Sequence, residues 1–387
     1  MKKVSSLSVF FNGITGKKLV GNLALYKGQF AAFQYSEEWL KNGFSISPFS
    51  LPLVDKVFIS EWEPFGGIFG VFNDSLPDGW GRLLVDRMLL KSGIDPNELS
   101  VLDRLAIVGS SGMGALSYEP ESYISKIKEL PFDLDEISNE CQRILNTELS
   151  SDAKENLDSI FSAGGSYGGA RQKILTTIDG EDWIIKFPSS QDPGNIGFQE
   201  YEYSKCAQEC GIEISNFKLF DSKKCKGYFG TKRFDRAMLN EKKYRIHMIS
   251  ASALLETSHR IPNLDYNILM KLTLELTHNM NEVEKLFRLM CFNVFAHNRD
   301  DHSKNFSWLY DENKNEWKLS PAYDLTYSNS IGGEHATTIN GEGKNPADKH
   351  LLSVAEKCGM KKVVAEEIVE VVRKRAEGLI KMLSVRG

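Results

Sequence analysis

The arrangement of strand-like and helix-like segments after residue 156 limits the fold of this chain most. Two adjacent strand patterns, at residues 172–178 and 183–187, come first, and a helical stretch at about 198–210 follows them. Beyond residue 247 the pattern is mainly helical. Strands that gather in one part of a domain and helices in another are typical of an α+β fold, whereas regular alternation would favour a parallel α/β sheet.

The first 120 residues form a separate unit. Strand patterns between residues 8 and 35 include Asn12-Gly13, which is typical of a hairpin turn, and a strong helix pattern runs from Trp80 to Lys91. A polar, acidic stretch at 119–156, with a helical part at 134–145, follows. We therefore expect an N-terminal subdomain at 1–120, a connecting segment at 121–155, a β-rich region at 156–246 and a helical region at 247–387.

Two capping signals predict where helices begin. Ser36 precedes a short helical segment that starts at Glu37, and Asn281 with Glu284 predicts a capping pair for the helix at 282–297.

The charge balance excludes some classes of function. The chain has 387 residues, with 47 basic and 52 acidic side chains and a formal charge of −5. This balance argues against a protein that binds nucleic acid by itself, because such binding needs a basic excess. No apolar run approaches the roughly 18 residues that a membrane helix needs. The six cysteines form no C-x-x-C pair, so we expect reduced thiols in a cytoplasmic protein.

A glycine-rich segment precedes the first strand of the β-rich region. It reads Gly164-Gly165-Ser166-Tyr167-Gly168-Gly169-Ala170. Glycines let backbone N–H groups converge on an anion, which suits a triphosphate. A flexible linker or a tight turn is the alternative, and the Walker A pattern does not occur in the chain.

Lys186 lies within the apolar strand pattern that follows this segment. A lysine in such a strand must reach solvent or meet a negative partner, because an unpaired buried ammonium group is costly. An ATP phosphate is one such partner, and Glu200 on the next helix is a candidate for an ion pair with the same lysine. A solvated edge lysine and a solvated helix glutamate are the alternatives.

The densest polar motif is Asn298-Arg299-Asp300-Asp301-His302-Ser303-Lys304-Asn305. Asp300 and Asn305 are five residues apart, and Asp324 follows 19 residues later. A kinase needs this order: a carboxylate beside the acceptor hydroxyl, then an amide and a second carboxylate on Mg²⁺. Lys304 could neutralise the transferred phosphoryl group. A divalent-metal hydrolase with Asp300, Asp301 and His302 as ligands, or a solvated acidic loop, is the competing interpretation.

Together these motifs resemble the HipA serine/threonine kinases, which are toxins of bacterial toxin–antitoxin pairs. The resemblance covers nearly the whole chain. It rests on Phe72–Gly79, Gly165–Lys173, Arg233–Arg236 and Asp300–Ser307. It implies a bilobal, protein-kinase-like α+β fold with a small N-terminal β/α subdomain, and ATP and Mg²⁺ as cofactors.

The resemblance also implies a role for individual residues. Asp300 and Lys304 would be catalytic, Asn305 and Asp324 would hold Mg²⁺, and Ser166 would be an autophosphorylated loop serine that switches the kinase off. The ATP-binding set would be Gly168, Gly169, Ala170, Arg171, Gln172, Lys173, Lys186, Lys232, Arg233, Phe234, His302, Asn305, Tyr323 and Asp324. Two residues depart from the family pattern: Tyr167 in the loop, and Asp301, which adds a negative charge that could raise the pKa of Asp300 or recruit another cation.

The family further implies partners. A HipA toxin phosphorylates an aminoacyl-tRNA synthetase, with glutamyl-tRNA synthetase as the best-known case, and so arrests growth. A separate HipB-like helix-turn-helix antitoxin binds the toxin and the operator, so that DNA is contacted only through the antitoxin. Two alternatives stay open: a small-molecule phosphotransferase of kinase-like fold, and a non-catalytic co-repressor that binds the antitoxin.

Overall fold

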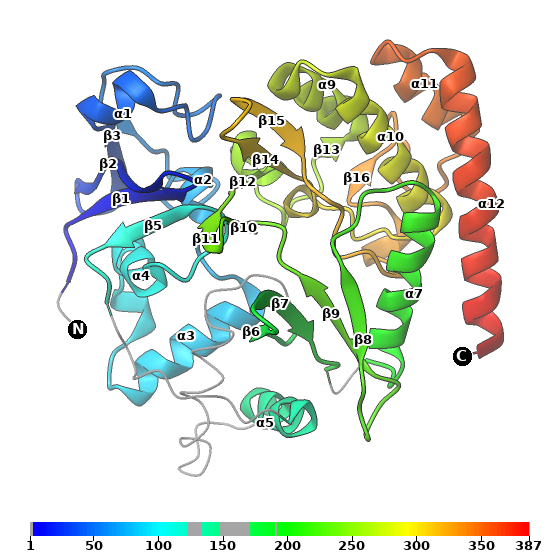
Figure 1. The fold of residues 1–387 in the computed structure, drawn as a ribbon, viewed down its shortest axis with the longest axis horizontal. Coiled ribbons are helices and arrows are strands. Elements are labelled where there is room, and N and C mark those ends of the chain that lie inside the picture. Colours follow the sequence, from blue (N-terminus) through cyan, green and yellow to red (C-terminus); the bar gives the residue numbers. More distant parts are fainter. Residues whose placement is uncertain (1–2, 123–132, 147–170, 190–191, 387) are drawn as a thin grey trace. The chain divides into compact units, whose positions relative to one another are not determined.

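The computed structural model describes residues 3–122, 133–146, 171–189 and 192–386, and the chain forms two compact units (Figure 1). Unit 1 consists of Met1–Gly197, Leu219–Ile249 and Ala253–Glu256, and unit 2 of Phe198–Lys218, Ser250–Ser252 and Thr257–Gly387. None of the described helices is both long and apolar enough to span a membrane.

A five-stranded sheet forms the N-terminal part of unit 1 (Figure 1). Its strands are β1 (Ser6–Gly13), β2 (Gly16–Tyr26), β3 (Phe30–Tyr35), β4 (Phe58–Ile59) and β5 (Leu116–Glu119), in the order β4-β3-β2-β1-β5. All four pairings are antiparallel. Leu7, Val9 and Phe11 alternate into the core, as the period of a half-buried strand requires. The strands predicted at residues 8–35 are therefore confirmed.

The first hairpin turn lies slightly later than the sequence predicted. Asn12 and Gly13 are still paired, with Lys17 and Gly16 respectively, so that Ile14-Thr15 makes the turn. Gly16 takes a positive φ of 92°, which a glycine adopts without steric cost. The prediction that Asn12-Gly13 forms the turn is therefore wrong by two residues.

Five helices lie wholly within unit 1 among the described residues. They are α1 (Glu37–Asn42), α2 (Gly70–Asn73), α3 (Gly79–Lys91), α4 (Val101–Val108) and α5 (Leu134–Asn146), with a 3-10 turn η1 (Pro96–Glu98). The Ser36 hydroxyl accepts a hydrogen bond from the Trp39 backbone N–H at 3.2 Å, which confirms the predicted cap of α1.

A second sheet carries Lys186, the strand lysine singled out in the sequence. Its strands are β6 (Lys173–Ile178), β7 (Glu181–Lys186), β9 (Tyr228–Lys232) and β8 (Phe217–Phe220), in the order β6-β7-β9-β8. Asp179 and Gly180 join β6 to β7, both with positive φ, as expected for an Asp-Gly hairpin turn. A small hairpin follows, with β10 (Arg236–Leu239) and β11 (Lys242–Arg245), and then β12 (His247–Ser250).

One face of this second sheet is covered by helices α3 and α5. The buried cluster contains Trp80, Leu84 and Met88 from α3, Ile137, Cys141 and Ile144 from α5, and Ile174, Ile185, Phe187 and Tyr228 from the sheet segment. Because side chains alternate across a strand, Lys173 and Lys186, next in sequence to Ile174 and Ile185, project from the opposite face. The sheet thus has an apolar face and a face that carries two lysines.

Unit 2 is mainly helical. Its elements are most of α7 (Ile196–Glu209), part of α8 (Ala251–Leu254), α9 (Tyr266–Thr277), α10 (Met280–Phe295), α11 (Asp348–Lys357) and α12 (Lys362–Arg386). The mainly helical character predicted beyond residue 247, including the helix at 282–297, is confirmed. The predicted cap of α10 is wrong, because Asn279 is the N-cap and accepts from the Asn281 N–H at 3.0 Å.

Short strands and turns connect the helices of unit 2. They are β13 (Leu264–Asp265), η3 (Ser303–Asn305), β14 (Ser307–Asp311), β15 (Glu316–Leu319), η4 (Ile331–Gly333) and β16 (Thr337–Thr338). β14 and β15 form an antiparallel hairpin, and β13 pairs with β16 in parallel. Between α10 and β14 lies the polar motif that the sequence singled out.

Candidate active site

The polar motif forms a tight loop after α10, here called the catalytic loop (residues 297–306). It begins where the helix ends, at Ala296, and the next residue, His297, has a positive φ of 53°. The Asn298 backbone N–H donates to the Asn293 carbonyl at 2.9 Å. His302 caps the following turn, because its Nδ1 accepts from the Lys304 N–H at 3.2 Å. The chain therefore reverses direction within a few residues and exposes Asp300.

Asn305 holds the catalytic loop closed around Asp300. Its amide nitrogen Nδ2 donates to the Asp300 carbonyl oxygen at 2.6 Å. This bond uses the nitrogen of the amide, so that Oδ1 is the atom of this side chain that can ligate a cation. The two ends of the D-x-x-x-x-N motif are thus joined directly by a hydrogen bond.

Asp324 lies in a segment that is tied to the same loop. The hydroxyl of Tyr323 donates to the Lys304 carbonyl at 2.6 Å and lies 2.6 Å from the Ser307 hydroxyl. Further along, the Ser328 N–H donates to the His297 carbonyl at 3.0 Å. Asp324 itself has a φ of 54°, an uncommon backbone conformation that aspartate tolerates better than most residues. The structure therefore brings the segments of Asp300, Asn305 and Asp324 together in unit 2.

Asp301 does not share the environment of Asp300. Its residue is 1% exposed, and its carboxylate accepts hydrogen bonds from Tyr266 and His335, each at 2.9 Å. A buried carboxylate that is occupied by these donors does not fit the recruitment of an extra cation, whereas its effect on the pKa of Asp300 stays a prediction. The same burial removes one ligand from the hydrolase interpretation. Among the described residues, no group of three or more His, Cys, Asp and Glu side chains could hold a metal ion.

Two lysines predicted to bind the nucleotide, Lys173 and Lys186, are directly opposite each other in the β6–β7 register. Opposed residues of an antiparallel pair share one face, and two like charges in this arrangement repel each other. The Lys186 ammonium also lies 5.7 Å from the centre of the Phe229 ring. Two ammonium groups on one face of the sheet are suited to bind the phosphates of a nucleotide. Glu200 is 2% exposed on α7 in unit 2, and its ion pair with Lys186 stays a prediction.

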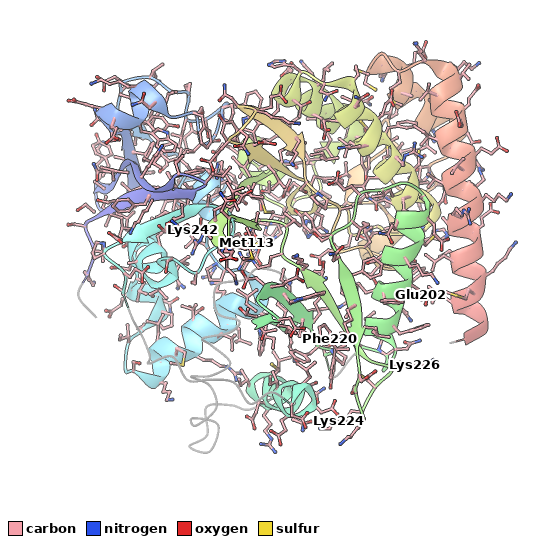
Figure 2. The ribbon with its side chains drawn as sticks, viewed as in Figure 1. Met113, Glu202, Phe220, Lys224, Lys226 and Lys242 are labelled. Atoms are coloured by element: carbon pink, nitrogen blue, oxygen red, sulfur yellow. The ribbon has the colours of Figure 1, made fainter. Side chains whose placement is uncertain are left out.

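The other nucleotide candidates in unit 1 have varied environments. Arg171 forms an ion pair with Asp192 at 3.7 Å, and Lys232 forms one with Glu181. Gln172 is 1% exposed, and its amide atoms have no partner among the described residues. Ser166, Tyr167, Gly168, Gly169 and Ala170 lie outside the described residues, and so does the rest of the glycine-rich segment. Phe220, on the edge strand β8 and labelled in Figure 2, packs edge-to-face on Trp183 of β7 with ring centres 5.8 Å apart.

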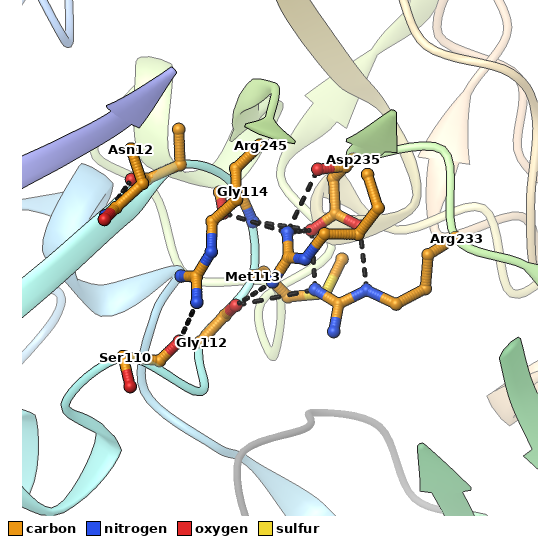
Figure 3. Close-up of polar contacts among 10 residues, drawn as sticks. Asn12, Ser110, Gly112, Met113, Gly114, Arg233, Asp235 and Arg245 are labelled. Atoms are coloured by element: carbon orange, nitrogen blue, oxygen red, sulfur yellow. Dashed lines mark hydrogen bonds and ion pairs between the residues drawn. The ribbon is translucent and has the colours of Figure 1, made fainter. Parts of the chain in front are cut away.

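Arg233 takes part in a buried ionic cluster around Asp235 (Figure 3). Asp235 is 1% exposed and accepts from Arg233 at 2.7 and 2.9 Å, from Arg236 at 2.8 Å and from the Gly114 N–H at 2.7 Å. Burial alone would raise the pKa of Asp235, but the two arginines outweigh it and hold that pKa below its usual range. Nearby, burial and the same arginines lower the pKa of Arg245 to about 10.

The arginines also bind the backbone of the N-terminal subdomain. Arg236 donates to the carbonyls of Gly112 and Gly114, at 3.0 and 3.1 Å, and Arg245 donates to Ser110 (Figure 3). The Arg233–Arg236 motif therefore anchors one part of unit 1 to another, and the side chain of Arg233 is engaged in that anchor. The sequence analysis missed Gly112 and Gly114 because a short glycine-containing loop carries no sign of a partner more than 100 residues away.

Comparisons with known proteins identify related sequences and a related fold. The sequence model of the HipA-like C-terminal domain matches residues 165–380, and that of the HipA N-terminal domain matches residues 8–119. Two similar proteins come from Sinorhizobium fredii (strain NBRC 101917 / NGR234). "Putative kinase Y4mE" is 28% identical over 360 residues, 83% of this chain and 77% of that protein. "Putative kinase Y4dM" is 25% identical over 299 residues, 72% and 69% of the two chains.

A solved structure shares the fold. It is a chain from the Shewanella oneidensis MR-1 complex of HipA, HipB and operator DNA, with a TM-score of 0.70 and 16% identity over 98% of this chain and 91% of that one. The expected kinase-like α+β fold of HipA proteins is therefore confirmed. Because the C-terminal family model alone spans more than half of the sequence, this chain belongs to the HipA family.

Proposed function

We propose that this chain is a HipA-type toxin kinase that transfers a phosphoryl group from ATP, with Mg²⁺, to serine or threonine hydroxyls of a protein. The observation that carries the proposal is the tethered catalytic loop. Asn305 binds the Asp300 carbonyl and Tyr323 binds the Lys304 carbonyl, each at 2.6 Å. These bonds tie the chain segments of Asp300, Asn305 and Asp324 to one another, which supports the roles that phosphoryl transfer would give these residues.

The donor atoms fit the proposed cofactors. Asn305 offers an amide oxygen and Asp324 a carboxylate, and oxygen ligands of this kind suit Mg²⁺. Lys173 and Lys186, on one face of β6 and β7, offer positive charge for phosphates. Mg-ATP, when bound, would supply the phosphoryl group and the cation that neutralises its charge.

The chain would contribute mainly positioning and electrostatic stabilisation. Asp300 would accept the proton of the substrate hydroxyl, because its side chain is exposed at the turn of the loop. Lys304 would stabilise the negative charge of the transferred group, and Lys186 would hold the phosphates of ATP.

The finer parts of the proposal rest on family membership. The substrate would be a cytoplasmic component of translation, with an aminoacyl-tRNA synthetase such as glutamyl-tRNA synthetase as the leading candidate. A HipB-like antitoxin would bind and inhibit the chain and would make the DNA contact, in line with the HipA–HipB–operator complex of the structural relative. Autophosphorylation of Ser166 would switch the kinase off.

The deciding experiment is incubation of the purified protein with Mg-ATP, followed by intact-mass analysis and peptide mapping. We expect one added phosphate, on the Ser166 peptide, in the wild type and none in Asp300→Asn. The variant should keep nucleotide binding, measured by the shift of the melting temperature with Mg-ATP. Equal phosphorylation of wild type and variant would contradict the role of Asp300.

The same preparation separates the alternatives. Bound ATP without transfer to any protein, including a lysate of translation components, would favour a non-catalytic co-repressor. Phosphorylation of small metabolites alone would favour a small-molecule phosphotransferase.

A further inference from the structure

The carboxylate of Asp301 is the centre of a buried polar network directly behind the catalytic loop. The side chains of Asp301 and His335 are 0% and 2% exposed. Oδ2 of Asp301 accepts from the Tyr266 hydroxyl and from Nδ1 of His335, both at 2.9 Å, and Oδ1 accepts from the Thr337 N–H at 3.2 Å. An ionised carboxylate in such a place is tolerated only when donors surround it.

The backbone of the loop is held by the same segment. The Ala336 N–H donates to the Arg299 carbonyl at 3.1 Å, and the Thr337 hydroxyl donates to the Asp301 carbonyl at 2.5 Å. Residues 335–337 therefore lie along residues 299–301, and they hold Asp301 by both its side chain and its main chain.

The network extends into the two helices next to the loop. Tyr266, the first residue of α9, also accepts from Asn293 Nδ2 at 3.0 Å, and Asn298 Nδ2 donates to Asn293 Oδ1 at 2.9 Å. Burial and the neighbouring Asp301 raise the pKa of Tyr266 far above its usual range, so its hydroxyl stays protonated and remains a donor. The donors to Asp301 thus come from a helix and from a distant loop segment.

Among the side chains that bind Asp301, His335 is the one whose replacement most directly tests whether this network anchors the catalytic loop. Its Nδ1 gives one of the three hydrogen bonds to the carboxylate, and the other two come from a tyrosine hydroxyl and a backbone N–H. Because Asp300 and Asp301 share a peptide bond, an orientation fixed at Asp301 is passed directly to Asp300.

We infer that His335 is a positioning residue for phosphoryl transfer: its Nδ1–H fixes Asp301, and through Asp301 it sets the direction of the Asp300 side chain. The kinetic part of this inference rests on the proposed kinase function. The anchoring part concerns the loop alone and can be measured without turnover.

The test compares His335→Leu, which removes the donor, with His335→Asn, whose carboxamide nitrogen lies close to the place of Nδ1. In His335→Leu we expect kcat to fall by roughly 10- to 100-fold with little change in the KM for ATP, since a small misplacement of a catalytic group has this effect. His335→Asn should recover most of the loss. His278→Asn, at the exposed C-cap of α9, is the matched control and should behave like the wild type.

Hydrogen exchange of the 297–306 peptide, without nucleotide, is the second measurement. His335→Leu should speed exchange of this peptide and His335→Asn should restore protection. Wild-type kcat and wild-type exchange in His335→Leu would overturn the inference even if the protein is a kinase. If the wild type transfers no phosphate, the proposed function fails, and the exchange result alone decides the anchor.

A second variant allows the inference to be tested even if the His335→Leu protein does not fold. Thr337→Val keeps the size of the side chain and removes only the hydroxyl that binds the Asp301 carbonyl. It should lower kcat and loop protection in the same direction, and unchanged kcat and unchanged protection in a folded Thr337→Val protein would overturn the inference.

Discussion

Two consecutive carboxylates in the catalytic loop have opposite environments. Asp300 is exposed, whereas Asp301 is buried and accepts hydrogen bonds from Tyr266, His335 and Thr337. A sequence motif gives both residues the same chemistry, but only one can meet a substrate. The distinction comes from the partners of Asp301, which lie about 35 residues away on either side along the chain.

The opposed lysines of β6 and β7 lead to a prediction about nucleotide binding. Lys186→Met should abolish most of the rise in melting temperature that Mg-ATP gives the wild type, because the phosphates lose a cation. The shift is compared with each protein's own melting temperature without nucleotide. Lys242→Met, an exposed lysine of the β10–β11 hairpin, is the control and should keep the full shift (Figure 2). A full shift in Lys186→Met would remove Lys186 from the site.

At the scale of elements, the start of helix α2 is held by a carboxylate from a distant segment. Both oxygens of Glu256 lie 3.0 Å from the Gly70 backbone nitrogen. A side chain at position 70 would also collide with the backbone of Ala253, since an added Cβ would lie 2.5 Å from its Cα. The close approach of these two segments thus requires the glycine. Burial raises the pKa of Glu256 to about 7, and nearby Asp74 adds to this effect.

This raised pKa predicts a pH-dependent stability. The unfolded chain ionises Glu256 near its ordinary pKa of about 4.5, whereas the folded chain retains the proton up to about pH 7. The stabilisation is therefore full below the unfolded pKa and is lost as the pH rises through about 7. Glu256→Gln keeps an acceptor for Gly70 and should remove this part of the pH dependence. Urea unfolding at pH 5 and pH 8 measures it, and identical pH profiles for the two proteins would contradict the assignment.

At the scale of the whole molecule, unit 1 joins parts that the two family models treat separately. Trp80 of the N-terminal part donates from Nε1 to the Lys173 carbonyl at 3.2 Å, at the start of β6. His247 Nε2 lies 2.9 Å from the Ile46 carbonyl oxygen, and the Asp235 cluster binds the 112–114 loop. The N-terminal subdomain is therefore built into the same core as the sheet that carries Lys186.

The ionic cluster around Asp235 leads to a prediction about the free energy of unfolding. Asp235→Asn leaves Arg233 and Arg236 buried without their charge partner and should cost about 3–5 kcal/mol in the free energy of unfolding. Asp182→Asn, which breaks the more exposed pair with Lys243, should cost under about 1 kcal/mol. Urea denaturation of the three proteins makes the comparison. Equal losses in both variants would show that the Asp235 cluster is not a special anchor.

The sequence by itself determined the local elements and the order of the motifs. Strand alternation at residues 8–35, the helix from Trp80 and the Asp-Gly turn at 179–180 depend on neighbours within a few residues, so that they can be read from the chain. The D-x-x-x-x-N spacing of the catalytic loop is local for the same reason.

The tertiary structure decided which polar side chains stay exposed and which are buried and hold the fold. Asp301 meets His335, and Asp235 meets Gly114, across 34 and 121 residues of sequence. No local period or cap encodes such a partner, because the contact exists only after the intervening elements have packed. Burial then makes the pairing obligatory, since an unpartnered charge in a core is far more costly than one in water.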